Sequence, residues 1–350
     1  MARAYEMELS LAAHKLLHDQ IKIKKGESVL ITIDSEADFK VAEEIAKMAN
    51  ALEAKVMVAW HSTPIGYGEV TMPYLPEPLI ECVDKTDIWI ELNKQWLLYS
   101  PIWTKAVTNG RTRQIMLGGL TIEQLCRCIG KVDIKVQKEF QDKVCELTLK
   151  SKKVRIETEA GTYIEFENDF IKKTINSEII YDTPGAHFLL GQIGWSPKEE
   201  SISGKIVFDG AVSGGGEAEL GILKDKITFL IEAGRIVRIE GKEEANIIER
   251  WFESLGDSNM YNVAHVCYGF NPFAKLEGTM TEDERIWGST EWGFGHQSPG
   301  FNRDGIGREA VSHFDGTCLN STVYLDDEKT MDNGILVNEE LKVLAKLLGK

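Results

Sequence analysis

The first third of the chain alternates between short apolar runs and amphipathic segments. The runs at 27–34 (ESVLITID) and 55–61 (KVMVAWH) predict buried strands, and the segment 35–54 between them predicts a helix that opens on a serine. Together they form a βαβ unit. The alternation continues with a helix at 77–85, strands at 86–92 and 112–119, and a helix at 121–130. We therefore expect an α/β N-terminal domain with a parallel sheet, covering residues 1–130.

The pattern changes after about Asp133. One more charged helix follows, and then short alternating segments, broken by Gly and Asn, predict antiparallel strands and hairpins. These segments are 153–168, 203–212, 226–241 and 321–327. Amphipathic segments at 242–256 and 338–349 predict two helices among them. An α+β C-terminal domain covering residues 131–350 is the expectation.

Composition narrows the function classes. The formal charge of -15 argues against a nucleic-acid partner, because neutralising phosphates requires a basic face. No run approaches the ~20 apolar residues of a membrane span, and the first 20 residues predict an amphipathic helix and not a signal peptide. The six cysteines lack zinc-ribbon spacing, which favours reduced, buried thiols in the cytoplasm. No Gly-x-Gly-x-x-Gly follows the first strand, so small-molecule or metal chemistry is preferred over dinucleotide binding.

Candidate chemistry begins at the segment SHFDG, where His313 and Asp315 lie two residues apart. In a strand both side chains project from the same face. A neutral imidazole and a carboxylate are suitable ligands for Fe, Mn, Co or Zn. The alternative is a surface histidine beside a solvated aspartate, and further ligands must decide between the two.

Two upstream segments supply such ligands. His265 stands in the strand-like run HVCYGFNP, and Glu291 in the Gly- and Trp-rich run DERIWGSTEWGFG. His265, His313 and one carboxylate would make a facial triad of the kind that suits non-haem Fe(II), and a second carboxylate leaves room for another metal. Alternatively, His265 is a core histidine with its own partners, and Glu291 caps a turn or pairs with Arg285.

The chain resembles a known superfamily along nearly its whole length. The resemblance rests on KKGESVLI, GQIGWSPKEESISGKIVFDG, HVCYGFNP, DERIWGSTEWGFG and SHFDGTCLN, of which the last four are specific. These segments resemble the metallo-aminopeptidases of the aminopeptidase T/S type, and more closely their 2,5-dihydroxypyridine 5,6-dioxygenase branch. The resemblance also implies a homodimer.

Against the aminopeptidase pattern, the closing His-x-Asp ligand pair falls on His313 and Asp315. The aminopeptidases have Glu where this chain has His265 and His where it has Glu291, so ligand types are exchanged while their number is kept. An earlier Glu ligand falls on Gln192, a poor metal ligand. The catalytic Tyr of that family has no counterpart near Ser298. Both losses count against a two-metal peptidase.

The dioxygenase branch holds one Fe(II) by Glu, His and Asp, and its Glu maps either onto His265 by position or onto Glu291 by type. Its substrate-contacting histidine corresponds to His187 in TPGAHFLLGQ. The histidine proposed as its general base falls near NKQWLLYS, which contains Lys94, Gln95 and Tyr99 but no histidine.

The leading hypothesis is a metalloenzyme, a mononuclear Fe(II) ring-cleaving dioxygenase-like enzyme acting on a small hydroxylated N-heteroaromatic compound. The metal ligands would be His265, Glu291, His313 and Asp315, with His187 and Glu291 as catalytic residues; Zn, Co or Mn could replace Fe. The alternatives are a metallo-aminopeptidase or another metal-dependent amide hydrolase, and a metal-binding protein without turnover. Tryptophans flanking the site segments favour a planar substrate, although tryptophans also fill cores; they are Trp96, Trp103, Trp195 and Trp292.

Overall fold

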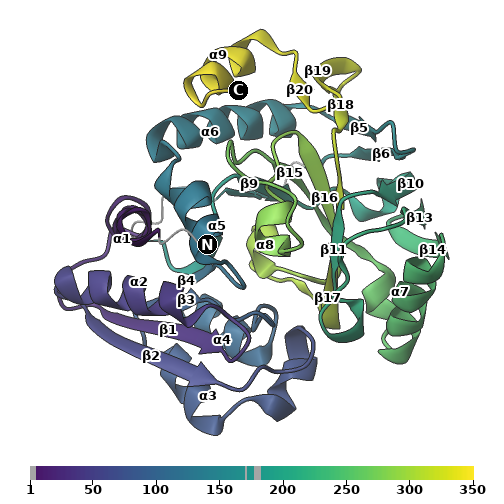
Figure 1. Cartoon of the computed structure of the whole chain (residues 1–350). Coiled ribbons are helices and arrows are strands. Elements are labelled where there is room, and N and C mark those ends of the chain that lie inside the picture. Colours follow the sequence, from purple (N-terminus) through teal and green to yellow (C-terminus); the bar gives the residue numbers. More distant parts are fainter. Residues whose placement is uncertain (1–4, 170–171, 177–182) are drawn as a thin grey trace. The chain divides into compact units, whose positions relative to one another are not determined.

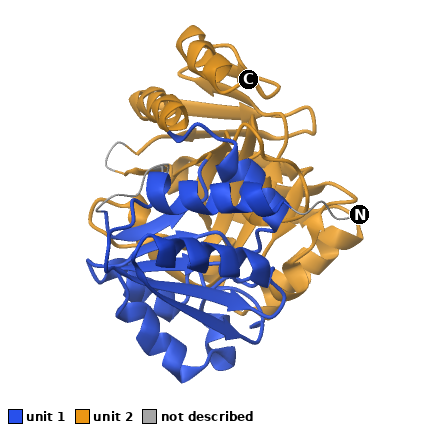
Figure 2. Ribbon diagram, turned by 60° about the vertical axis from the view of Figure 1, so that its left-hand side comes forward, with its two compact units in different colours: residues 1–134, 177–190 blue, residues 135–176, 191–350 orange. Residues whose placement is uncertain are grey.

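The protein is described from a computed structural model that covers residues 5–169, 172–176 and 183–350 (Figure 1). Its internal contacts divide the chain into two compact units (Figure 2). Unit 1 comprises residues 1–134 and 177–190, and unit 2 comprises residues 135–176 and 191–350. None of the described helices has the length and apolar character that crossing a membrane requires.

Unit 1 contains a parallel sheet with the strand order β2-β1-β3-β4-β8. The strands are β1 (Ser28–Asp34), β2 (Lys55–His61), β3 (Ile88–Glu91), β4 (Arg113–Met116) and β8 (Gly185–Phe188). The α-helices are α1 (Glu6–His14), α2 (Phe39–Ala51), α3 (Glu77–Asp84), α4 (Pro101–Thr108) and α5 (Ile122–Leu125). Short π-helical turns extend α1 over Lys15–Gln20 and α5 over Cys126–Gly130. The predicted α/β class of the N-terminal region is confirmed.

Local sequence explains most of these elements. Strand β1 is buried over Val29–Asp34, as expected for a strand covered on both faces. Helix α2 begins at Phe39, because the carboxylate of Asp38 accepts a hydrogen bond from the Lys40 backbone N–H and caps the helix. It therefore starts later than Ser35, the residue that the sequence analysis proposed.

Two elements of unit 1 were not foreseen. Helix α4 connects the parallel strands β3 and β4, which need such a crossover, and the cap Ser100 followed by Pro101 was an available signal. Strand β8 pairs in parallel with β4, with Ile115 beside His187, although it follows the change of pattern near residue 133. The domain boundary placed at residue 130 remains a prediction.

Unit 2 contains two antiparallel sheets within its described residues. The first has the order β14-β13-β10-β6-β5-β18-β19-β20, and the second has the order β12-β11-β17-β16-β15-β9-β7. The strands of the first sheet are β5 (Lys153–Glu157), β6 (Tyr163–Glu167), β10 (Ser203–Phe208), β13 (Ile227–Glu232), β14 (Arg235–Glu240), β18 (Thr322–Leu325), β19 (Glu328–Asp332) and β20 (Ile335–Leu336). Those of the second are β7 (Thr174–Asn176), β9 (Gln192–Trp195), β11 (Ala211–Ser213), β12 (Gly221–Ile222), β15 (Val263–Gly269), β16 (Ser289–Gln297) and β17 (Arg308–Cys318). The helices are α6 (Ile134–Lys150), α7 (Glu243–Ser254), α8 (Met280–Asp283) and α9 (Glu339–Leu347). The predicted mixed α and β content is confirmed.

An aromatic core joins the two sheets of unit 2. Phe208 and Phe229 from the first sheet meet Phe294 and Phe314 from the second, and the ring centroids of Phe229 and Phe294 are 5.2 Å apart. Successive side chains of a strand point to opposite faces. Since Phe294 and Phe314 face the core, the odd-numbered residues beside them on β16 and β17 face the other way.

Candidate metal centre

The face of the second sheet that points away from the aromatic core carries the predicted ligands. Strands β15, β16 and β17 lie next to one another, and their register places His265 opposite Gly293 and Gly293 opposite Asp315. Glu291 and His313 lie two residues from Gly293 and Asp315, and therefore on the same face. All four ligand candidates are buried, with Glu291 fully inaccessible to solvent. The structure thus brings together side chains from three segments.

Gly293 makes this arrangement sterically possible. A Cβ atom at this position would lie 2.2 Å from Cε1 of His265, so only glycine lets the imidazole cross the neighbouring strand. Without that space the ring could not approach Asp315 on β17.

Gly293→Ala is expected to lower metal affinity at least about tenfold while the chain stays folded, because the added methyl group displaces the His265 ring. Competition with a chelator measures the affinity, and circular dichroism checks the fold. Gly300→Ala is the matched control, since its Cβ would meet only side-chain atoms, the flexible end of Ile175 and the hydroxyl of Ser298, both at 3.3 Å. Equal metal affinity in the two variants would show that His265 does not need this position.

The hydrogen bonds of His313 orient it as a ligand. Its Nδ1 lies 2.8 Å from the backbone oxygen of His296, and its Nε2 lies 2.8 Å from Oδ1 of Asp315. Nδ1–H donates to the carbonyl and Nε2–H donates to the carboxylate, so a metal bound by His313 would take the place of the proton on Nε2. Metal-bound histidines are commonly held in this way by a backbone carbonyl.

His265 and Glu291 complete the cluster. Nε2 of His265 lies 3.3 Å from Oε2 of Glu291 and 3.5 Å from Oδ1 of Asp315. The rings of His265 and His313 stack with centroids 5.1 Å apart. Nδ1 of His265 and both carboxylate oxygens of Glu291 are buried and find no hydrogen-bond partner among the described residues. Buried polar atoms without partners are costly, and a cation bound by these atoms would satisfy them.

The donor set fits a divalent metal. Ligand atoms of His265, His313 and Asp315 lie within 4.8 Å of one another, as do those of Glu284, Glu291 and Asp315. Ligands about 2.1 Å from a metal and at right angles to each other are about 3 Å apart, close to the spacing of the His313–Asp315 pair. Imidazole and carboxylate together suit first-row divalent ions.

Electrostatics in the centre favour a cation. Burial raises the pKa of Glu291 to about 8, with the charge of Asp315 adding to the effect and His265 opposing it. Burial acts to lower the pKa of His265, but the charges of Glu291 and Cys267, together with hydrogen bonds to Asp315 and Cys267, outweigh it and hold the pKa well above the usual value. Burial acts to raise the pKa of Asp315, yet the charge of His313 and hydrogen bonds from both histidines hold it below the usual value. The raised pKa values of Glu291 and His265 favour protons on these groups, and a bound metal would replace those protons.

Comparison with known proteins places the chain in a family. The sequence profile of the NicX family, described as 2,5-dihydroxypyridine 5,6-dioxygenase, matches residues 11–338. The chain belongs to this family. A 2,5-dihydroxypyridine 5,6-dioxygenase from Pseudomonas putida KT2440 is 26% identical over 174 residues, which make up 45% of this chain and 47% of that protein. The match therefore spans about half the length of the curated relative.

Solved structures share the fold of this NicX-family chain. The 2,5-dihydroxypyridine dioxygenase from Pseudomonas putida KT2440 has a TM-score of 0.73 at 18% identity, covering 95% of this chain and 98% of that one. AmpT from Thermus thermophilus has a TM-score of 0.67 at 14% identity, covering 96% and 100%. The resemblance to this superfamily and to its dioxygenase branch is confirmed, and the family is one of enzymes, as predicted.

Gln192 of the NicX-family chain is engaged in a buried polar network. Its side-chain nitrogen donates to Oε2 of Glu284 at 2.8 Å, and its oxygen accepts from the Arg285 guanidinium at 2.8 Å. Arg285 is fully buried and also pairs with Glu284. The idea that Glu291 pairs with Arg285 is therefore not supported, because both Glu291 oxygens lack a hydrogen-bond partner in the described part of the chain.

Sequence reasoning missed two members of this face. Cys267 forms a compact group with His265 and Glu291, and Glu284 forms one with Glu291 and Asp315. Strand periodicity was an available signal for Cys267, which lies two residues after His265. Glu284 directly follows the short helix α8 and had no periodic signal.

His187 belongs to unit 1, on β8, whereas the ligand candidates belong to unit 2. Its Nε2 lies 2.8 Å from the backbone oxygen of Thr183. Burial lowers its pKa to about 4, so the ring is neutral at pH 7. Its catalytic role stays a prediction.

Two of the four tryptophans, Trp195 and Trp292, do not lie on the ligand face. Trp195 and Trp292 flank Val266 in the register and belong to the core of unit 2. In unit 1, Trp103 donates to the side-chain oxygen of Gln114, and Trp96 stacks on another buried ring. The core alternative is correct for Trp195 and Trp292, and they give no support to a planar substrate.

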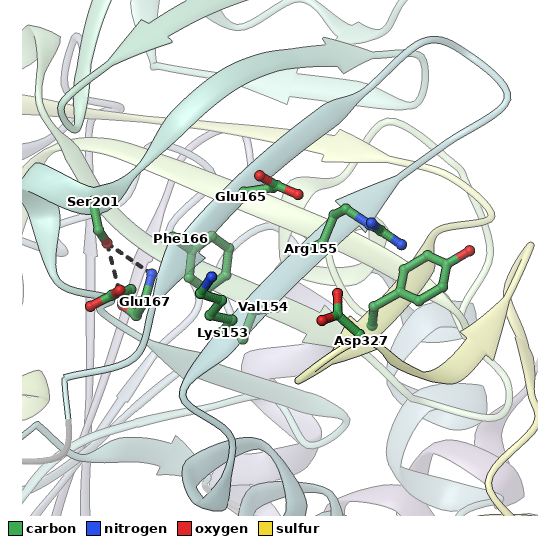
Figure 3. A pocket seen from close by; sticks show the side chains of 9 residues that line it. Lys153, Val154, Arg155, Glu165, Phe166, Glu167, Ser201 and Asp327 are labelled. Atoms are coloured by element: carbon green, nitrogen blue, oxygen red, sulfur yellow. Dashed lines mark hydrogen bonds between the residues drawn. The ribbon is translucent and has the colours of Figure 1, made fainter.

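A separate pocket lies on the first sheet of unit 2 (Figure 3). There the Arg155 guanidinium lies 4.0 Å from the centroid of the Tyr324 ring, and the Ser201 hydroxyl accepts a hydrogen bond from the Glu167 backbone N–H. Among the described residues, the groups that could hold a metal all lie on the second sheet or just after α8, and not in this pocket. The candidate centre is therefore the ligand face of β15, β16 and β17.

Proposed function

We propose that the protein is a metal-dependent, ring-cleaving dioxygenase that acts on a small hydroxylated N-heteroaromatic compound. The buried cluster of His265, Glu291, His313 and Asp315 on one sheet face carries the proposal. Membership of the NicX family supports this reaction class. Fe(II) is the preferred metal, since two imidazoles and a carboxylate suit non-haem iron, and Zn, Co or Mn remain alternatives.

A bound Fe(II) would supply the redox chemistry that a reaction with O₂ requires. The protein residues have separable roles around it. Asp315, with its low pKa, stays anionic and offsets positive charge. Nδ1–H of His313 donates a hydrogen bond to the His296 carbonyl, which fixes the orientation of the ring.

Proton transfer is assigned to His187 and Glu291. Donation from Nε2–H of His187 to Thr183 leaves Nδ1 as an acceptor, so the neutral ring can take a proton from a ring hydroxyl. Glu291, with a pKa of about 8, exchanges protons near neutral pH when it is not a ligand. Which of His265 and Glu291 is the third metal ligand stays open in this proposal.

The hydrolase alternative retains the AmpT fold but is weaker chemically. A two-metal peptidase needs a second cation to activate water and to hold the substrate. At Gln192 the amide oxygen is occupied by Arg285, whose buried positive charge also opposes a cation beside Glu284. These contacts favour a mononuclear centre.

Turnover assays separate the two functions. Protein purified without air and loaded with Fe(II) is expected to consume O₂ with 2,5-dihydroxypyridine or a related hydroxypyridine, and to release no nitroaniline from Leu-p-nitroanilide. Efficient cleavage of the anilide without O₂ uptake on any hydroxypyridine would overturn the proposal.

One tightly held metal per chain is the expected stoichiometry. After gel filtration, elemental analysis should find one divalent ion both in the wild-type protein and in Gln192→Glu, because Arg285 still supplies a positive charge beside the new carboxylate. The double variant Gln192→Glu/Arg285→Met tests that reason, because it lacks the positive charge of Arg285 that competes with a second metal ion. Two tightly held metals in the wild type would contradict the mononuclear centre.

The assembly and location are also proposals. A homodimer rests on the superfamily resemblance, and sedimentation as a monomer at micromolar concentration would remove it. No disulfide joins the six cysteines, all of which lie in described segments, in agreement with the expected reduced thiols. A cytoplasmic location stays a prediction.

A further inference from the structure

Cys267 occupies a position on the ligand face that the proposed function does not use. It lies two residues after His265 on β15 and directly opposite Glu291 on β16. On its other side it opposes Gly194, where a Cβ atom would come within 2.9 Å of its sulfur. The side chain is 2% exposed, so the thiol is enclosed on the same face as the candidate ligands.

The thiol completes a second donor set. A nitrogen of His265, Sγ of Cys267 and a carboxylate oxygen of Glu291 all lie within 4.8 Å of one another. Both oxygens of Glu291 are buried, and the only ion-pair contact they make in the described part of the chain is the 3.3 Å approach of Oε2 to Nε2 of His265, a member of the same donor set. The burial of this carboxylate without an accepted hydrogen bond is an observation independent of the cysteine itself.

The two donor sets differ in chemical softness. The first consists of His265, His313 and Asp315 and offers nitrogen and oxygen atoms. The second offers nitrogen, oxygen and sulfur, and thiolate sulfur selects soft or borderline ions. Because both donor sets include His265, we expect only one of them to bind an ion at a time.

We propose that His265, Cys267 and Glu291 form an alternative site for thiophilic divalent ions such as Cd²⁺ or Zn²⁺. Binding breaks the S–H bond of Cys267, forms a metal–sulfur bond and releases the proton to solvent, with no change in oxidation state. A thiophilic ion therefore displaces a harder ion from the shared histidine. This extends the proposed function without depending on turnover.

Titration of the reduced, metal-free full-length protein with Cd²⁺ tests the site. The wild type should develop a near-ultraviolet thiolate-to-cadmium absorption band that saturates at one equivalent. Cys267→Ala and the closer mimic Cys267→Ser should lose the band and bind Cd²⁺ at least about tenfold more weakly. Their Mn²⁺ affinity should change little, because the first donor set remains.

Cys318→Ala is the matched control. Cys318 is fully buried on β17, but it belongs to the core and pairs with Thr290 in the register, so its variant should keep the band. A band that persists in both Cys267 variants, or Cd²⁺ binding to the wild type without a band, would overturn the inference. Failure of the oxygen-uptake assay would count against the proposed function alone, since no step of this titration uses turnover.

Discussion

His313→Ala should abolish retention of a divalent metal while leaving the chain folded. His313 and Asp315 project from one strand with 2.8 Å between Nε2 and Oδ1, so the backbone holds them in a fixed relation. The contact of Nδ1 with the His296 carbonyl further restricts the ring. Elemental analysis after dialysis measures the loss, and circular dichroism confirms the fold.

Glu291→Gln should weaken metal retention less than His313→Ala, because Glu291 comes from a separate strand and water can replace it. His18→Ala is a matched histidine control, since that side chain is exposed and pairs with its neighbour Asp19. If His313→Ala keeps a full complement of metal, the SHFDG segment is an ordinary strand and the assigned centre is wrong.

Metal affinity should rise with pH by about tenfold per pH unit for each proton displaced, up to about pH 8. Metals bind deprotonated ligands, whereas the metal-free centre holds protons on Glu291, with a pKa of about 8, and on His265, whose pKa also lies above its usual value. Below these pKa values binding must expel a proton, so affinity falls as the pH falls. Asp315, with its lowered pKa, adds no such competition near neutral pH.

Calorimetry in two buffers with different ionisation enthalpies counts the protons released at each pH, and chelator competition gives the affinity. Glu291→Gln should show a smaller slope below pH 8, because its amide holds no acidic proton. An affinity that stays constant between pH 6 and 8 in the wild type would contradict the proton-bearing cluster.

Some features followed directly from local sequence. Period-two alternation and apolar runs identified β1, β2 and β5, because burial on one or both faces of a strand determines which of its consecutive residues are apolar. The common face of His313 and Asp315 followed for the same reason, since two residues of one strand need no knowledge of any other segment. Motif resemblance then predicted the superfamily, which the comparisons confirm.

Other features depended on the arrangement of strands. The meeting of His265 with Asp315 requires the register across β15, β16 and β17, and the missing side chain of Gly293 between them. No local sequence pattern in any of the three segments predicts that register.

By itself, therefore, the sequence determined the types of most elements, the enzyme superfamily and the common face of His313 and Asp315. Only the tertiary structure decided that Trp292 faces the core, that Arg285 occupies the oxygen of Gln192, and that Cys267 joins the ligand face. The physical reason is that periodicity reflects the environment of neighbouring residues, whereas strand register and buried pairing are set by packing among segments distant in the chain.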